Sequence, residues 1–166
     1  MESNYSLQRV DAGTKMGTGE ECFMILIACI DDNKGMMFNH RRQSQDRVLR
    51  QHILDMVGDA KLWMNGYSAK MFAKDQEELL QERIQTDEDF LEKASEGEYC
   101  FVEDKDCSGD MFPDTTHVEA VVLYKWNRAY PADQYFSMDL SDWKIVETGE
   151  FAGSSHEKIT EERYER

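Results

Sequence analysis

The chain has 166 residues, 40% of them hydrophobic, which is enough for one domain with its own core. Its formal net charge of −15 argues against binding to a nucleic-acid backbone, which needs clustered Lys and Arg. No apolar run reaches the roughly 20 residues of a membrane span, and the start lacks a signal-peptide pattern. These totals predict a soluble cytoplasmic protein and leave its oligomeric state open.

The first part of the chain divides into a polar leader and the start of a folded domain. Residues 1–22 are rich in Gly, Ser and Thr without a sustained period, so we expect a disordered leader before a domain at 23–166. Residues 23–30 are continuously apolar, as in a strand buried on both faces of a sheet. Ser44 is a candidate N-cap for a helix that runs to Val57 and stops at Gly58.

The remaining elements alternate between strands and helices. Residues 61–64 and 99–102 have the pattern of short strands, and helix-like acidic segments lie between them at 67–83 and about 87–94. An apolar run follows at 120–124, and strand-like segments at 143–146 and 158–164 close the chain. This order predicts an α/β fold with a mostly parallel central sheet and an antiparallel pair of C-terminal strands.

Cysteine and histidine spacing gives little support to a metal site or a nucleophilic site. The four cysteines form no CxxC pair and are typical of thiols in a reducing compartment. Residues 104–110 have the acidic spacing of an EF-hand loop, but Thr115 stands where its bidentate Glu belongs, so a solvated turn is the preferred interpretation. We therefore expect no metal. The four histidines are scattered, and no Ser-His-Asp arrangement is visible.

Three segments, taken in order, resemble dihydrofolate reductases. Residues 24–35, Met-Ile-Leu-Ile-Ala-Cys-Ile-Asp-Asp-Asn-Lys-Gly, resemble the opening strand and glycine turn of that family. Residues 61–66 are similar to the strand that ends in its Met-Gly-Arg turn, and residues 130–136, Tyr-Pro-Ala-Asp-Gln-Tyr-Phe, resemble its Phe-x-Ala-Asp-Thr-x-Phe segment. The resemblance implies a three-layer domain with helices on both faces of the sheet.

The same resemblance implies a ligand cleft at the C-terminal ends of the first strands. It makes Asp46 the catalytic candidate, because the family's matching carboxylate assists protonation of the pterin, which needs a buried acid with a raised pKa. An alternative is that Asp46 only stabilises the first turn of its helix. Asn65 and Ser68 lie where the cleft is expected, and Tyr124 stands where the family has a pterin-contacting Thr.

Departures from the family affect the cofactor site. The segment from Gly35 to Asp46 is shorter than the family's loop and lacks its Leu-Pro-Trp. Glu103 and Asp104 replace the paired glycines that let the family's backbone approach a pyrophosphate, and carboxylates there would repel it. We therefore expect the usual NADPH site to be lost, which leaves the cofactor unknown, with NADP as one candidate.

Four arginines cluster near Asp46: Arg41, Arg42, Arg47 and Arg50. The last two occupy helix positions that the family usually fills with apolar residues that pack against the ligand. Guanidinium groups suit carboxylates and phosphates, so the cluster predicts a small anionic or nucleotide ligand. The alternative is that these arginines pair with the chain's own Asp and Glu residues.

Three functions remain open at this point. The first is a divergent dihydrofolate reductase-like protein that binds a small anionic, nucleotide or pterin ligand near Asp46. The second is an active NADPH-dependent reductase of dihydrofolate or a related pterin, with Asp46 as proton donor. The third is an interaction module without catalysis, whose acidic residues 70–110 bind another protein.

Overall fold

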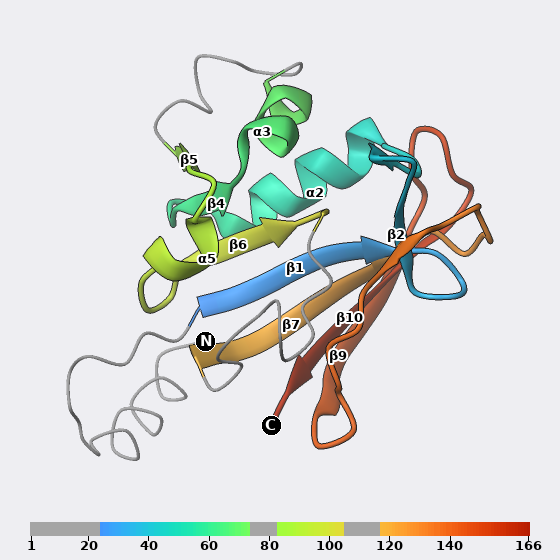
Figure 1. Cartoon of the computed structure of the whole chain (residues 1–166). Helices are drawn as coiled ribbons and strands as arrows, with labels where there is room; N and C mark the ends of the chain where they lie inside the picture. The colour runs from blue at the N-terminus through green and yellow to red at the C-terminus, as the bar shows by residue number, and fades with distance from the viewer. Residues whose placement is uncertain (1–23, 74–82, 105–116) are drawn as a thin grey trace.

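The computed structural model describes residues 24–73, 83–104 and 117–166 (Figure 1). The predicted leader at residues 1–22 and most of the acidic segment at 104–110 lie outside these ranges. Within the described ranges, no helix is long and apolar enough to cross a membrane.

In the described part of the chain, the main sheet has seven strands in the order β5-β4-β6-β1-β7-β10-β9. They are β1 (Met24–Ile30), β4 (Leu62–Met64), β5 (Ile84–Thr86), β6 (Tyr99–Val102), β7 (Val118–Lys125), β9 (Lys144–Phe151) and β10 (Ile159–Glu165). The five strands from β5 to β7 pair in parallel, whereas β10 pairs antiparallel with both β7 and β9. This confirms the predicted parallel sheet with antiparallel C-terminal strands, and it makes β1 and β6 neighbours.

A second sheet of three short antiparallel strands, among the described residues, was not predicted. It comprises β2 (Gly35–Phe38), β3 (Arg41–Arg42) and β8 (Gln134–Tyr135), in the order β3-β2-β8. Glycine is required at position 35 because neighbouring side chains pack closely against its backbone. An added Cβ would lie 2.6 Å from both the Ala132 Cβ and the Gln43 Nε2. The sheet fixes the segment that leads into the following helix.

The described helices are α2 (Arg47–Val57), α3 (Gly66–Phe72) and α5 (Phe90–Lys93). The predicted N-cap Ser44 is wrong, because α2 is capped by Asp46, whose carboxylate accepts from the N–H groups of Val48 and Leu49. Gly58 ends α2 with a φ of 62°, as predicted. Of the predicted helix at 67–83, α3 covers the first part, up to Phe72, and residues 74–82 lie outside the described ranges; β5 begins at Ile84.

Alternate side chains of β1 point to opposite faces of the sheet, and different elements pack against each face. Ile25 and Ile27 pack with α2 and α3, which lie over one face (Figure 1). Met24, Leu26 and Ala28 pack on the other face with Phe90 of α5 and with apolar side chains of residues 136–143. The predicted three layers are therefore present, with one short helix and an extended segment forming the third.

Candidate functional site

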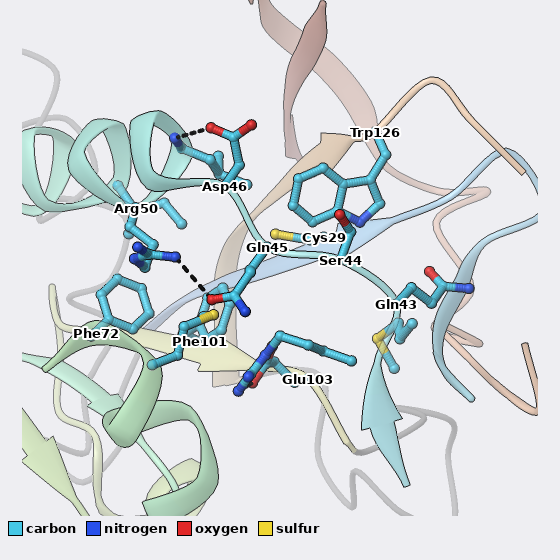
Figure 2. A pocket seen from close by; sticks show the side chains of 15 residues that line it. Cys29, Gln43, Ser44, Gln45, Asp46, Arg50, Phe72, Phe101, Glu103 and Trp126 are labelled. Carbon is cyan, nitrogen blue, oxygen red and sulfur yellow. Dashed lines mark hydrogen bonds and ion pairs between the residues drawn. The ribbon is translucent and has the colours of Figure 1, made fainter. Parts of the chain in front are cut away.

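A hollow lies beside the C-terminal end of β1, between this strand, α2 and α3. Apolar side chains from β1, β6 and the two helices line it together with polar side chains of residues 42–46 (Figure 2). The hollow measures about 400 Å³ when its solvent-open mouth is included, but only about 20 Å³ can take the centre of a water molecule. That space suits about one water, whereas drug-sized ligands occupy sites of about 300–1,000 Å³. The protein's own side chains therefore fill this site.

An ion pair between Arg42 and Glu103 occupies part of the hollow. Arg42 Nε and Nη2 donate to the Glu103 oxygens at 2.8 and 3.0 Å, and the guanidinium lies 4.2 Å from the centre of the Tyr67 ring. Ser68 Oγ donates to the same carboxylate at 2.6 Å. Burial tends to lower the pKa of Arg42, but its hydrogen bond and charge interaction with Glu103 outweigh burial and raise that pKa, so the guanidinium stays charged.

Arg50 brings a second guanidinium into the hollow from α2. Arg50 is only 7% exposed, and its Nη1 donates to Gln45 Oε1 at 3.3 Å. Both side chains are directed into the hollow (Figure 2). Arg41 and Arg47 are exposed and do not line the hollow. Of the four arginines of the predicted cluster, all within the described ranges, Arg42 and Arg50 therefore reach the hollow.

The Asp46 carboxylate points away from the centre of the hollow (Figure 2) and is 2% exposed. It accepts hydrogen bonds from the backbone N–H groups of Val48, Leu49, Ser154 and Ser155. Burial tends to raise the pKa of Asp46, but the Ser154 and Ser155 N–H groups and His156 outweigh burial and hold the pKa well below its usual range. Gly153 allows this packing, since an added Cβ would overlap the carboxylate.

His156 connects Asp46 to two hydroxyl groups. Its Nδ1 lies 3.1 Å from Asp46 Oδ2, and its Nε2 lies 3.2 Å from Ser44 Oγ and 3.0 Å from Tyr130 Oη. The ring is 5% exposed and stacks on Trp126 at 4.4 Å. The prediction that the chain lacks a Ser-His-Asp arrangement is therefore wrong. No local motif could have shown it, because His156 lies 110 residues after Asp46.

Sequence comparison adds nothing here, since no protein-family model and no curated protein matches the chain. Among solved structures, dihydrofolate reductase from Enterococcus faecalis, complexed with NADP(H) and RAB-propyl, is similar with a TM-score of 0.56. The match covers 87% of this chain and 96% of that chain at 10% identity. This chain has the dihydrofolate reductase fold. At such low identity the likeness establishes the fold alone.

Within this dihydrofolate reductase fold, several residue roles predicted from sequence need correction. The raised pKa expected of Asp46 is wrong, and its side chain caps a helix instead. The Glu103 carboxylate accepts hydrogen bonds from Arg42 and Ser68, and the expectation that it repels a pyrophosphate stays a prediction. Tyr124 is fully buried away from the hollow, and its hydroxyl donates to Glu161 Oε2 at 3.3 Å.

Asn65 and Ser68 converge with the other predicted residues, but they lie behind the lining of the hollow. Asn65 caps α3 by accepting from the Ser68 N–H, and its Nδ2 donates to Asp104 Oδ2 at 2.8 Å. Both are buried. They therefore hold the acidic pair that follows β6 in place rather than line the hollow.

Cys29 lies in the wall of the hollow, where a thiol could act as a nucleophile only if it ionised. Burial, assisted by the charge of Glu103, raises the pKa of Cys29 far above neutrality, so the thiol stays protonated. Within the described residues, no group of three or more His, Cys, Asp or Glu side chains is placed to hold a metal ion.

Proposed function

We propose that this protein binds a compact anionic small molecule, such as a carboxylate or phosphate compound or a nucleotide, and does not reduce dihydrofolate. The observation that carries the proposal is the position of Arg50, a guanidinium only 7% exposed beside Phe72 and Phe101 in the wall of the hollow. A cation among apolar side chains attracts an anion more strongly than one in water does. Its planar fork also matches carboxylate and phosphate geometry.

Ligand entry requires side chains of the hollow to move, because the free space holds about one water. Arg42 and Gln45 belong to the segment before α2, and each is held at this site by a hydrogen bond to another lining residue. An incoming anion would compete with Glu103 for Arg42 and with Gln45 for Arg50. We expect a compact anion to displace these contacts at lower cost than a pterin or a dinucleotide.

Two features support binding over reduction. The lowered pKa of Asp46 keeps its carboxylate ionised, so it has no proton to give to a pterin at neutral pH. Glu103 and Asp104 follow β6 where the family has glycines, which favours loss of the NADPH site. The interaction-module alternative, which rests on the acidic residues of 70–110, stays a prediction; six of these 14 acidic residues, at 74–82 and 105–110, lie outside the described ranges.

The setting we propose is the cytoplasm, with a small molecule as the binding partner. Cys29 and Cys100 are free thiols in the described part of the chain, as is usual in a reducing compartment. The net charge of −15 disfavours a nucleic acid as partner.

Thermal unfolding in phosphate, compared with chloride at equal ionic strength, tests the proposal. Phosphate at ten times its dissociation constant should stabilise the protein by about 1.4 kcal/mol, a rise in Tm of about 3 to 6 °C. Arg50→Met should abolish this rise, because it removes the guanidinium and keeps much of the side-chain volume. Arg47→Met is the matched control on the exposed face of the same helix and should leave the rise unchanged.

Two results would contradict the proposal. One is the absence of any phosphate-specific rise in Tm in the wild-type protein. The other is an equal rise in the wild type and both variants, which would assign the effect to general ion binding at the surface.

A further inference from the structure

The hydrogen-bonded chain from Asp46 through His156 to Ser44 has the order carboxylate, imidazole, hydroxyl. The Asp46 Oδ2 to His156 Nδ1 distance is 3.1 Å, and the His156 Nε2 to Ser44 Oγ distance is 3.2 Å. Both distances lie within the hydrogen-bond range expected between the groups of a nucleophilic site in an enzyme without substrate. The same order activates serine nucleophiles on unrelated folds, where it is recognised by geometry and not by sequence position.

The charge of Asp46 fixes the tautomer of His156. An ionised carboxylate can only accept hydrogen bonds, so the proton between the two groups must lie on Nδ1. In the neutral ring, Nε2 is then an acceptor, and it faces the hydroxyl groups of Ser44 and Tyr130. Asp46 therefore holds the imidazole ready to take a proton from a hydroxyl group.

The position of Ser44 separates it from an ordinary buried hydrogen-bond partner. Ser44 is half-buried and lines the hollow, together with Arg50 and with Trp126, which stacks on His156. His156 itself is 5% exposed and lies behind this lining. Ser44 is thus part of the wall of the hollow, while the imidazole that contacts its hydroxyl is shielded from solvent.

We propose that Ser44 is the nucleophile of an esterase reaction on small esters that carry a carboxylate or phosphate group. Ser44 Oγ attacks the ester carbonyl carbon while its proton passes to His156 Nε2. The bond from carbon to the leaving oxygen then breaks, and the alcohol departs with that proton. Water, deprotonated by His156, next attacks the acyl-serine; the acid is released, and Ser44 regains its proton.

The proposed reaction gives different roles to different residues. Ser44 and His156 touch the reacting atoms and are catalytic, whereas Asp46 acts through His156 and is a positioning residue. The anionic class of the ester rests on the proposed function, since it depends on Arg50. The assignment of Ser44 as the nucleophile does not depend on Arg50.

Labelling with a fluorophosphonate, which phosphonylates activated serines, tests the nucleophile directly. Incubation of the full chain, followed by peptide mass spectrometry, should place one phosphonyl group on Ser44. Ser44→Ala should remove the label, and His156→Gln should slow labelling by about 100-fold or more. Ser137→Ala, an exposed serine outside this chain of hydrogen bonds, is the matched control and should be labelled like the wild type.

Labelling results are interpreted only for variants that retain a cooperative thermal transition. Asp46→Asn should slow labelling by about 100-fold while the folded protein still responds to phosphate, a split that simple loss of folding cannot produce. Ser44→Cys, which keeps a nucleophile of similar size, should retain acylation by an activated ester if Ser44→Ala proves unstable. Absence of a label on the folded wild type, or a label on Tyr130, would overturn the assignment of Ser44.

The ester class is tested with p-nitrophenyl acetate and with the mono-p-nitrophenyl ester of succinate, which carries a free carboxylate. We expect a burst of about one p-nitrophenolate per chain, faster for the anionic ester, with the preference lost in Arg50→Met. Phosphate stabilisation without a burst or a label would overturn this inference and leave the proposed function standing. Labelling of Ser44 without anion preference and without phosphate stabilisation would overturn the proposed function and the anionic class of ester, but not the nucleophile.

Discussion

At the scale of single residues, Asp46 illustrates how one carboxylate can serve several structural tasks. It caps α2, accepts hydrogen bonds from two backbone N–H groups in the turn between β9 and β10, and contacts His156. All these partners favour the ionised form, which is why its pKa falls although the side chain is buried. The residue that the family resemblance marks as an acid is here an anion at neutral pH.

Asp46→Asn should lower the free energy of unfolding by about 2 to 4 kcal/mol at neutral pH, because an amide leaves buried donors unpaired. The folded pKa lies below the unfolded value of about 4, so this contribution is complete above that pH and is lost as the pH falls through the folded pKa. Urea unfolding of both proteins from neutral to acidic pH should therefore show their stabilities converging in acid. Asp31, whose pKa is also lowered, is present in both proteins, so the difference isolates Asp46. A constant difference at all pH values would contradict this account.

At the scale of secondary-structure elements, the Arg42–Glu103 ion pair joins the β2–β3 hairpin to the end of β6. Their side chains are 16% and 9% exposed, and the pair stands beside Tyr67 of α3. Breaking a buried pair leaves one uncompensated charge, which costs more than losing both charges together. The hairpin and the sheet should therefore be energetically coupled through these two side chains.

A double-mutant cycle with Arg42→Met and Glu103→Gln measures that coupling. Each single change should destabilise the protein by about 3 kcal/mol, and the pair should show a coupling energy of about 1 to 3 kcal/mol in urea unfolding. The exposed pair of Lys158 and Glu150, 3.6 Å apart with more than half of each side chain exposed, is the control. We expect its coupling to stay below about 0.5 kcal/mol. Additive effects at Arg42 and Glu103 would show that the ion pair does not join the hairpin to the sheet.

The elements that sequence could predict are those with a local signal. The apolar runs of β1 and β6 mark strands without knowledge of their partners, and Gly58 marks a helix end. The pairing of the short strands β2 and β8 has no such signal, because it joins segments about 100 residues apart, such as Gly35 and Tyr135. The carboxylate of the N-cap Asp46 likewise has distant partners, the N–H groups of Ser154 and Ser155.

The candidate site likewise contains residues that the sequence could predict and residues that it could not. Arg42, Arg50 and Asp46 stand out in the sequence because four arginines gather near one carboxylate in an acidic chain. Arg42 and Asp46 have partners at the distant ends of other strands: Glu103 follows β6, and His156 lies between β9 and β10. Contacts of this kind depend on the register of the whole sheet. They could not be inferred from spacing.

At the scale of the whole molecule, the sheet and layers of the dihydrofolate reductase fold are kept, while the hollow beside β1 is filled by side chains. Fold alone does not carry an activity. What differs here is the chemistry presented at the ends of the strands: an ion pair, a buried guanidinium and a serine backed by histidine. The proposed function assigns to this fold the binding of a compact anion.

The most direct test of this account uses Trp126, which lines the hollow, as the reporter. With Trp63 and Trp143 changed to Phe, its fluorescence is titrated with phosphate and with NADPH, and NADPH oxidation is then followed in the presence of dihydrofolate. The account predicts a saturable response to phosphate that Arg50→Met removes, no tighter binding of NADPH than of phosphate, and no oxidation. Tight NADPH binding with turnover of dihydrofolate would contradict it.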